Sequence, residues 1–357
     1  MARRRLAALL LVVVSLAASA CAAAPAAPLP PAPAGPALRV MTFNLLGAQG
    51  DDSVYSEHAG WAARVDQLQP DVLVVQEAQT EDVTALLSRT TTDYQLAAYE
   101  LWWCDTKNNP EGVAVLVKGT VPLLGGGGTN VGGSCQDPTL SRVLVWADVS
   151  FAGEPYRVYG THLTAGGGTA AASRARQIDL VRERIAADDP AGARHWLLAG
   201  DMNFTPGSGD YGRMLHGAAG STGPGDLTDT FAVLHPGAAS PTTCPQYSSA
   251  DTAAQPYLLA NPEVVRACGY TAGWAKDDNP LQCEVLSLCT SWEVRRDTSV
   301  RNRIDMVLAP DGGPLEVTRT YVPNRADTDW AAVGAEWFRL ADHLPYVVDL
   351  TPVAPTP

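Results

Sequence analysis

The 357-residue sequence lacks several signatures that would assign it to a common functional class. Basic residues are scarce: 25 lysines and arginines face 38 acidic residues, giving a formal charge of −13. The chain therefore has no broad basic surface for tight, non-specific DNA binding, although a nuclease or a cation-holding acidic site stays compatible. No two cysteines have the Cys-x-x-Cys spacing of a zinc site. The glycine-rich stretches 123–133 and 165–168 lack the Gly-Lys-Ser/Thr of a P-loop, and we expect flexible surface loops there.

Residues 1–20 have the pattern of an export signal. An arginine run precedes "LAALLLVVVSLAASA", an apolar stretch too short for a comfortable membrane span. The next residue, Cys21, resembles the lipidated cysteine of a bacterial lipobox, although Ala18 stands where Leu or Val is more usual. The alternative is ordinary cleavage after Ala20 or Ala23 and free secretion. The sequence thus predicts export, with the product either secreted or anchored through a lipidated Cys21 to the outer face of the cell membrane.

The exported part is predicted to be one domain on a tether. Residues 21–37 are rich in proline and alanine, which favours an extended, semi-rigid tether, and residues 38–352 follow as a single catalytic domain. Within it, the stretch of about 207–300 is long for a connection, and we interpret it as a disulfide-bearing insertion. Six cysteines allow up to three disulfides; Cys104–Cys135 is the favoured early pair, and the pairing of the later four stays open: Cys244, Cys268, Cys283 and Cys289.

Predicted strands and helices alternate from residue 38 onward, which is typical of an α/β fold. Short apolar runs predict strands at 38–44, 71–77, 112–118, 142–150, 156–163, 195–203, 303–309, 315–322 and 345–350. Helical spacing predicts helices at 58–68, 81–89 and 170–187. In the last helix we expect Arg174 and Arg176 to lie on a solvated face.

Polar side chains stand where several predicted strands end. In "HWLLAGDMNFTP" (195–206), Asp201 and Asn203 lie two residues apart, so a continuing strand would place them on one face, and Gly200 would let the backbone come close. Each such residue alone is explained as a turn residue, a cap or a surface histidine. Together they predict a site, because open α/β sheets carry their chemistry at strand ends. The other members of the set are Asn44, Glu77, His162, Asp305, Asp342 and His343.

Six motifs that contain these residues stand in a familiar order: "MTFNLLG", "DVLVVQEAQ", "GTHL", "GDMNFTP", "RIDMVL" and "ADHLPYVV". In this order they resemble the endonuclease/exonuclease/phosphatase superfamily, over about residues 38–351. That group includes pancreatic-type deoxyribonucleases, apurinic endonucleases, bacterial sphingomyelinases and inositol-polyphosphate phosphatases. The resemblance implies an α/β fold, a four-layer α/β/β/α sandwich of two packed mixed β-sheets.

The resemblance also implies a metal site. Glu77 would be the principal ligand of Mg²⁺, with Asn44 beside it and Asp342 as a further ligand. Mn²⁺ or Ca²⁺ are the alternatives. Many members have serine before the closing Asp-His, whereas Ala341 stands here, so one supporting hydrogen bond is expected to be missing.

The remaining residues receive catalytic roles by the same resemblance. Asp305 would orient His343, and the pair would act on the in-line water or the phosphate. Asp201 would position or deprotonate the attacking water. Asn203 would donate a hydrogen bond to the phosphate, and His162 would bind the phosphate or assist the leaving oxygen.

These expectations predict an exported Mg²⁺-dependent phosphodiesterase, a monomer that acts on nucleic acid or phospholipid. A nuclease is slightly favoured. The alternative is a sphingomyelinase or phospholipase, for which Trp102, Trp103 and Trp337 would form an aromatic lip at the membrane. A third hypothesis is a catalytically silent, surface-anchored binding protein on the same fold.

Overall fold

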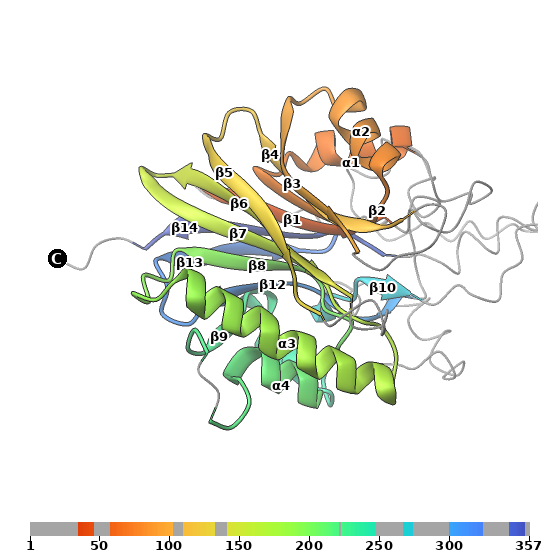
Figure 1. Ribbon diagram of the computed structural model, residues 1–357, viewed down its shortest axis with the longest axis vertical. Coiled ribbons are helices and arrows are strands. Elements are labelled where there is room, and N and C mark those ends of the chain that lie inside the picture. The colour runs from red at the N-terminus through yellow and green to blue at the C-terminus, as the bar shows by residue number, and fades with distance from the viewer. Residues whose placement is uncertain are drawn as a thin grey trace, which may run out of the picture.

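Two six-stranded mixed sheets form the centre of the protein (Figure 1). A computed structural model describes residues 35–45, 58–102, 110–132, 141–220, 223–246, 267–273, 300–323 and 343–353. The first sheet has the order β13 (Leu315–Tyr321), β14 (Tyr346–Pro352), β1 (Leu38–Asn44), β2 (Val72–Ala78), β4 (Gly112–Lys118), β3 (Tyr94–Leu101). The second has the order β5 (Leu123–Asn130), β6 (Val143–Phe151), β7 (Glu154–His162), β8 (Trp196–Asp201), β12 (Asp305–Pro310), β9 (Leu227–Asp229).

Helices cover the outer faces of both sheets, which confirms the predicted four-layer sandwich. In Figure 1, α1 (His58–Leu68) and α2 (Thr80–Arg89) lie on the first sheet, and α3 (Thr169–Asp188) and α4 (Gly209–His216) on the second. The short helices α5 (Thr230–Leu234) and η2 (Pro236–Ala239) follow β9. No described helix has the length and apolar character needed to cross a membrane.

The middle strands are apolar on both faces because each face meets a different layer. In β8, Leu197 and Ala199 pack into the core shared with the first sheet. The alternate residues Trp196 and Leu198 pack with Ile178 of α3. A strand buried on both sides reads as a continuous apolar run, and this is why such runs predicted strands here.

Each sheet contains one parallel pair of strands, and these pairs place the ends that carry the site. β1 runs parallel to β2, with α1 between them in the chain, and β7 runs parallel to β8, with α3 between them. The carboxyl ends of parallel strands meet at one edge of a sheet. β12 runs antiparallel to β8, so its first residue, Asp305, pairs with the last residue of β8, Asp201.

The glycine-rich stretch is a strand over Leu123–Asn130, so the prediction of a flexible loop was wrong there. This strand, β5, pairs with β6 at the edge of the second sheet. A Cβ on Gly126 would lie 2.2 Å from the Ala97 carbonyl oxygen of β3, in the first sheet. Glycine therefore lets the edges of the two sheets approach each other. Residues 165–168 do form a loop, as predicted.

Arg174 is buried, which corrects the expectation of a solvated helix face. Its Nε donates to Asp210 Oδ2 at 2.8 Å, and its Nη1 donates to the carbonyl oxygens of Thr164 and Gly166 at 2.8 and 2.9 Å. The guanidinium thus ties the loop after β7 to α4. Arg176 is exposed, as expected.

Part of the predicted insertion belongs to the second sheet. β9 pairs with β12, and a two-stranded ribbon joins β10 (Ala272–Gly273) to β11 (Val300–Asn302). One disulfide, Cys244–Cys268, lies among the described residues. Residues 1–34, with the export signal, Cys21 and most of the tether, lie outside the described residues, as do Cys104, Cys135, Cys283 and Cys289. Their assignments and the single-domain boundary stay predictions.

Candidate functional site

Five strand ends from the two sheets bring the predicted site residues together. Asn44 ends β1, and Glu77 lies next to the end of β2 in the first sheet. His162 ends β7, Asp201 ends β8, and Asp305 begins β12 in the second sheet. His162 and Asp305 both pair with Asp201 in register. All five side chains are buried except Glu77, which is half-buried.

A β-bulge aims Glu77 into the site. The register of β2 with β4 shifts between Gln76 and Ala78, and Glu77 has a φ of +51°. The preceding side chain stays in the sheet, where Gln76 Nε2 donates to Thr42 Oγ1 at 3.0 Å and the threonine hydroxyl donates back at 3.2 Å. A bulge bends the strand locally and can re-aim a side chain toward a site. The left-handed backbone conformation is energetically costly for a glutamate, and the apolar run of β2 does not predict it.

Asp201 and Asn203 are adjacent, but a turn brings them together rather than a shared strand face. β8 ends at Asp201, and Asn203 is left-handed, with a φ of +51°. The Asn203 backbone N–H donates to Asp201 Oδ1 at 2.9 Å. A Cβ on Gly200 would lie 2.0 Å from the Thr161 carbonyl oxygen, so the predicted close backbone approach at this glycine is confirmed.

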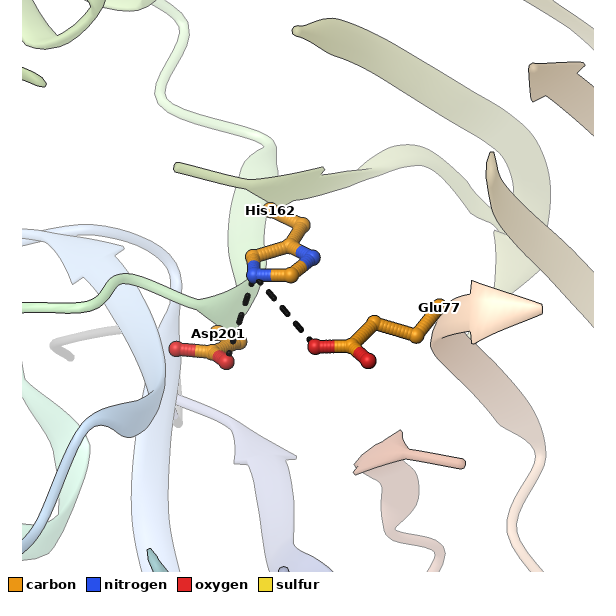
Figure 2. A group of neighbouring side chains, drawn as sticks. All are labelled: Glu77, His162 and Asp201. Carbon is orange, nitrogen blue, oxygen red and sulfur yellow. Dashed lines mark ion pairs between the residues drawn. The ribbon is translucent and has the colours of Figure 1, made fainter. Parts of the chain in front are cut away.

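Asn44 holds the two carboxylates of the site together. Its Nδ2 donates to Glu77 Oε1 at 2.9 Å and to Asp201 Oδ2 at 3.0 Å. His162 completes the group in Figure 2, with its Nε2 3.4 Å from Asp201 Oδ2 and 3.9 Å from Glu77 Oε1. The amide of Asn44 thus turns its nitrogen to the carboxylates, and a ligand role for its oxygen stays a prediction.

His162 is neutral in this arrangement. Asn203 Nδ2 lies 2.8 Å from His162 Nε2 and also donates to the Leu163 carbonyl oxygen at 2.9 Å. Because an amide nitrogen only donates, Nε2 must accept, and the proton sits on Nδ1. Nδ1 is buried and has no hydrogen-bond partner among the described residues. Burial, then the charges of Arg142 and His343, hold the pKa of His162 well below its usual value.

His343 stands between two aspartates. Its Nδ1 lies 2.7 Å from Asp305 Oδ2, and its Nε2 lies 3.8 Å from Asp201 Oδ2. Burial raises the pKa of Asp201 to about 7, and the negative charge of Asp305 adds to this effect. His343 and the hydrogen bonds from Asn44 and Asn203 act in the opposite direction. Asp201 is therefore balanced between its two protonation states near neutral pH.

The donor set fits a divalent cation. Two overlapping groups each offer ligand atoms within 4.8 Å of one another: Glu77, His162 and Asp201, and Asp201, Asp305 and His343. Asp305 Oδ1 is buried without a hydrogen-bond partner in the described part of the chain, so it remains available as an acceptor. Clustered carboxylate oxygens suit hard cations such as Mg²⁺, Mn²⁺ or Ca²⁺. Asp342, the further predicted ligand, lies outside the described residues.

One cation beside the site was not predicted. The Arg142 guanidinium lies over the Trp102 ring, 3.9 Å from its centroid. The same ring meets His162 edge-on, with centroids 5.4 Å apart. Arg142 opens a predicted strand, and no motif singled it out. The position of Arg142 beside His162 depends on the tertiary arrangement of β6, β7 and the end of β3, and so it could not be predicted from the sequence.

Comparison with known proteins identifies the family. The model of the Endonuclease/Exonuclease/phosphatase family matches residues 41–343. The chain belongs to this family. The matched span contains every predicted site residue, and the prediction of a metal-dependent phosphoric ester hydrolase is confirmed at the level of the family. No curated protein sequence matches the chain.

Solved structures of this family share the fold. The catalytic domain of human nocturnin, with a bound sulfate, is 18% identical and has a TM-score of 0.56, and the match covers 89% of this chain and 95% of that chain. A mannosyl-6-phosphatase of Bacteroides thetaiotaomicron is 16% identical (TM-score 0.53; 88% and 99% covered). D. rerio TDP2, complexed with a single-strand DNA product, is 14% identical (TM-score 0.53; 88% and 99% covered).

Proposed function

We propose that the protein is an exported, Mg²⁺-dependent phosphodiesterase whose favoured substrate is nucleic acid. The observation that carries this proposal is the meeting of Glu77 and Asp201 with the Asp305–His343 pair, from two different sheets, at one cluster of strand ends. A hard-oxygen cation site next to an acid-oriented imidazole is what phosphodiester hydrolysis requires. The alternative of a catalytically silent binding protein is disfavoured because both the glutamate and the closing histidine are in place.

Glu77 and Asp201 would hold the cation, with Asn44 and Asp342 as the further predicted ligands. When bound, Mg²⁺ supplies charge neutralisation for the phosphate oxygens and lowers the pKa of a ligated water. Asn44 contributes independently of its ligand role, because its amide keeps the two carboxylates within reach of one ion.

The other residues would handle the water and the phosphate. Asp201, whose Oδ1 and Oδ2 lie among the polar groups of the site, would position or deprotonate the attacking water. Asp305 fixes the orientation of His343, whose Nε2 points toward Asp201. The Asn203 amide donates to His162 Nε2 and to the Leu163 carbonyl oxygen, so to donate to a phosphate oxygen it would exchange one of these two hydrogen bonds.

The surroundings of His162 favour a nuclease over a lipid phosphodiesterase. Arg142 provides a cation beside the site, which suits the closely spaced phosphates of a nucleic-acid strand. Trp102 packs beneath Arg142 and against His162, so it is not a free member of an aromatic lip. Trp103 and Trp337 lie outside the described residues. A sphingomyelinase or phospholipase activity is kept as the alternative.

A substrate panel tests the substrate class. With Mg²⁺ present, we expect turnover of plasmid DNA and of bis(p-nitrophenyl) phosphate, and slower turnover of RNA, sphingomyelin and p-nitrophenyl phosphate. Arg142→Gln should raise the KM for DNA by about tenfold, because one charge-assisted phosphate contact is lost. Arg176→Gln, at an exposed position of α3, is the matched control and should leave the KM unchanged. Rapid hydrolysis of sphingomyelin with none of DNA would establish the lipid alternative, and no turnover of any substrate would favour the binding protein.

Export is proposed from the pattern of residues 1–20 alone. A monomeric state is also proposed. Mass spectrometry of the N-terminus from the native source distinguishes the two routes. A diacylglyceryl group on Cys21 is expected for a membrane-anchored lipoprotein, whereas an unmodified N-terminal Cys21 or Ala24 indicates free secretion after cleavage behind Ala20 or Ala23. An intact Met1 would contradict export.

A further inference from the structure

A short, buried segment of the predicted insertion lies against the catalytic strands. Residues 267–273 precede β11, and their side chains Cys268, Tyr270 and Thr271 are buried, with Thr271 fully so. An insertion that only decorated the surface would not need a buried threonine. The contacts of Thr271 show what this segment does.

Thr271 is hydrogen-bonded to the chain next to both members of the Asp305–His343 pair. Its Oγ1 accepts from the backbone N–H groups of Asp305 and Ile304, at 3.2 and 3.3 Å. Its carbonyl oxygen accepts from the N–H of Leu344, which follows His343, at 2.7 Å. One residue thus connects two segments that lie almost forty positions apart in the sequence and whose side chains must meet at 2.7 Å.

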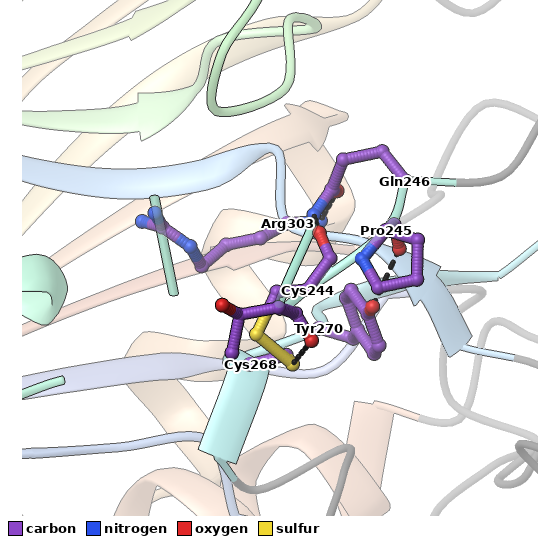
Figure 3. The surroundings of a disulfide bond; sticks show 7 residues. Cys244, Pro245, Gln246, Cys268, Tyr270 and Arg303 are labelled. Carbon is purple, nitrogen blue, oxygen red and sulfur yellow. Dashed lines mark hydrogen bonds between the residues drawn. A yellow bond between two sulfur atoms is a disulfide. The ribbon is translucent and has the colours of Figure 1, made fainter. Parts of the chain in front are cut away.

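The segment that carries Thr271 is anchored to residues 244–246 by a disulfide and a hydrogen bond (Figure 3). Cys268 is bonded to Cys244, and Tyr270 Oη donates to the Pro245 carbonyl oxygen at 2.5 Å. From the same stretch, Gln246 Oε1 accepts from the Arg303 N–H at 2.9 Å, two residues before Asp305. The stretch 244–246 therefore fixes both Thr271 and the start of β12.

We propose that Thr271 is a positioning residue for the Asp305–His343 pair, and that the Cys244–Cys268 disulfide keeps Thr271 in place for this task. The inference rests on the proposed hydrolytic function, in which this pair acts. It gives the insertion a role in catalysis: the cross-link holds an imidazole and its carboxylate at their working distance. Small displacements of catalytic groups are expensive, with losses on the order of 10²-fold for about 1 Å.

Replacement of Thr271 separates positioning from general stability. In the Mg²⁺-loaded enzyme, Thr271→Val should lower kcat for bis(p-nitrophenyl) phosphate by about 10- to 100-fold with little change in KM. Thr271→Ser keeps the hydroxyl and should restore kcat. Thr230→Val is the matched control: Thr230 is also fully buried, but its hydroxyl bonds to the Val307 carbonyl and the Tyr346 hydroxyl instead. It should lower the melting temperature and leave kcat unchanged. Equal losses of kcat in both valine variants would overturn the proposal.

Hydrogen exchange tests the same inference without any substrate. Peptides that cover 303–306 should exchange about tenfold faster in Thr271→Val, because two amides lose their acceptor. In Cys244→Ser/Cys268→Ser, peptides 303–306 and 343–346 should both exchange faster. Thr230→Val should alter neither. Unchanged exchange in the first two variants would refute the positioning role, whereas an inactive wild type with the expected exchange pattern would refute only the proposed function.

Discussion

At the residue scale, the site is a cluster of negative charge that requires neutralisation. Glu77 and Asp201 both accept hydrogen bonds from one amide, that of Asn44, and Asp305 lies opposite Asp201 in the sheet. Burial of like charges in a small volume disfavours their ionised forms, and this raises the pKa of Asp201. A carboxylate arrangement that is unfavourable alone becomes favourable when a cation binds.

Replacement of Asp201 should stabilise the metal-free protein. In EDTA the pKa of Asp201 is higher in the folded state than the ordinary aspartate value, so its contribution to stability is present at low pH and is lost as the pH rises through about 7. Asp201→Asn removes this loss. The rise from 3.8 to about 7 sets an upper limit of about 4 kcal/mol, at about 1.4 kcal/mol per pKa unit, and Asp201→Asn also weakens the hydrogen bonds from Asn44 and Asn203, so at pH 8 we expect a net gain on the order of 1–2 kcal/mol in the free energy of unfolding.

Thermal unfolding at several pH values measures this difference. The melting temperature of wild type in EDTA should fall between about pH 4 and 7 more steeply than that of Asp201→Asn, and the two curves should run parallel above about pH 7. Saturating Mg²⁺ should reverse the order, because only wild type binds the ion well. If the melting temperatures of the two proteins in EDTA changed with pH in parallel over this whole range, the pKa of Asp201 would not be raised in the folded protein.

The sequence identified the residues of the site but not their surroundings. Asn44 and His162 could be predicted because each ends an apolar run, and Asp305 because it alternates with the apolar residues of the predicted strand 303–309. The bulge that aims Glu77 could not, because it depends on the pairing of β2 with β4. Arg142 could not either, because an arginine at the start of a strand has no distinguishing pattern in one sequence.

At the scale of secondary structure, prediction succeeded where burial is two-sided and missed three of the four edge strands, β3, β5 and β9; the fourth, β13, was predicted at 315–322. β1, β4 and α1 have the predicted bounds, because their apolar patterns are strong. β3 and β5 are edge strands, and their polar or glycine-rich sequences carry no strand signal. Gly126 illustrates why β5 was missed. A glycine is needed there because β5 lies close to β3 of the other sheet, and this tertiary contact has no local sequence signal.

In the insertion, too, the tertiary contacts could not be predicted from the sequence. Its cysteines predicted a disulfide, and Cys244–Cys268 is present. No pattern in the sequence connects this cross-link with Asp305 or His343, because Thr271 contacts the chain beside them only in the tertiary fold. The structure therefore changes the interpretation of the described part of the insertion, from a surface elaboration to a support for the site.

At the scale of the whole molecule, the two-sheet sandwich followed from the order of six motifs and not from periodicity. Alternating strands and helices are equally typical of a single open sheet. The sandwich matters for function because each sheet alone carries half of the site: Asn44 and Glu77 come from one, and His162, Asp201 and Asp305 from the other. Packing of the sheets is thus the step that assembles the catalytic centre.

The most direct test of the central claim is the rate of bis(p-nitrophenyl) phosphate hydrolysis with Mg²⁺ and with EDTA. We expect turnover in wild type that EDTA abolishes and added Mg²⁺ restores. Glu77→Gln and His343→Ala should each lower kcat by at least about 100-fold. Glu81→Gln, an exposed glutamate on the neighbouring helix α2, should behave as wild type. Full activity in EDTA, or in Glu77→Gln, would contradict a metal-dependent site at these strand ends.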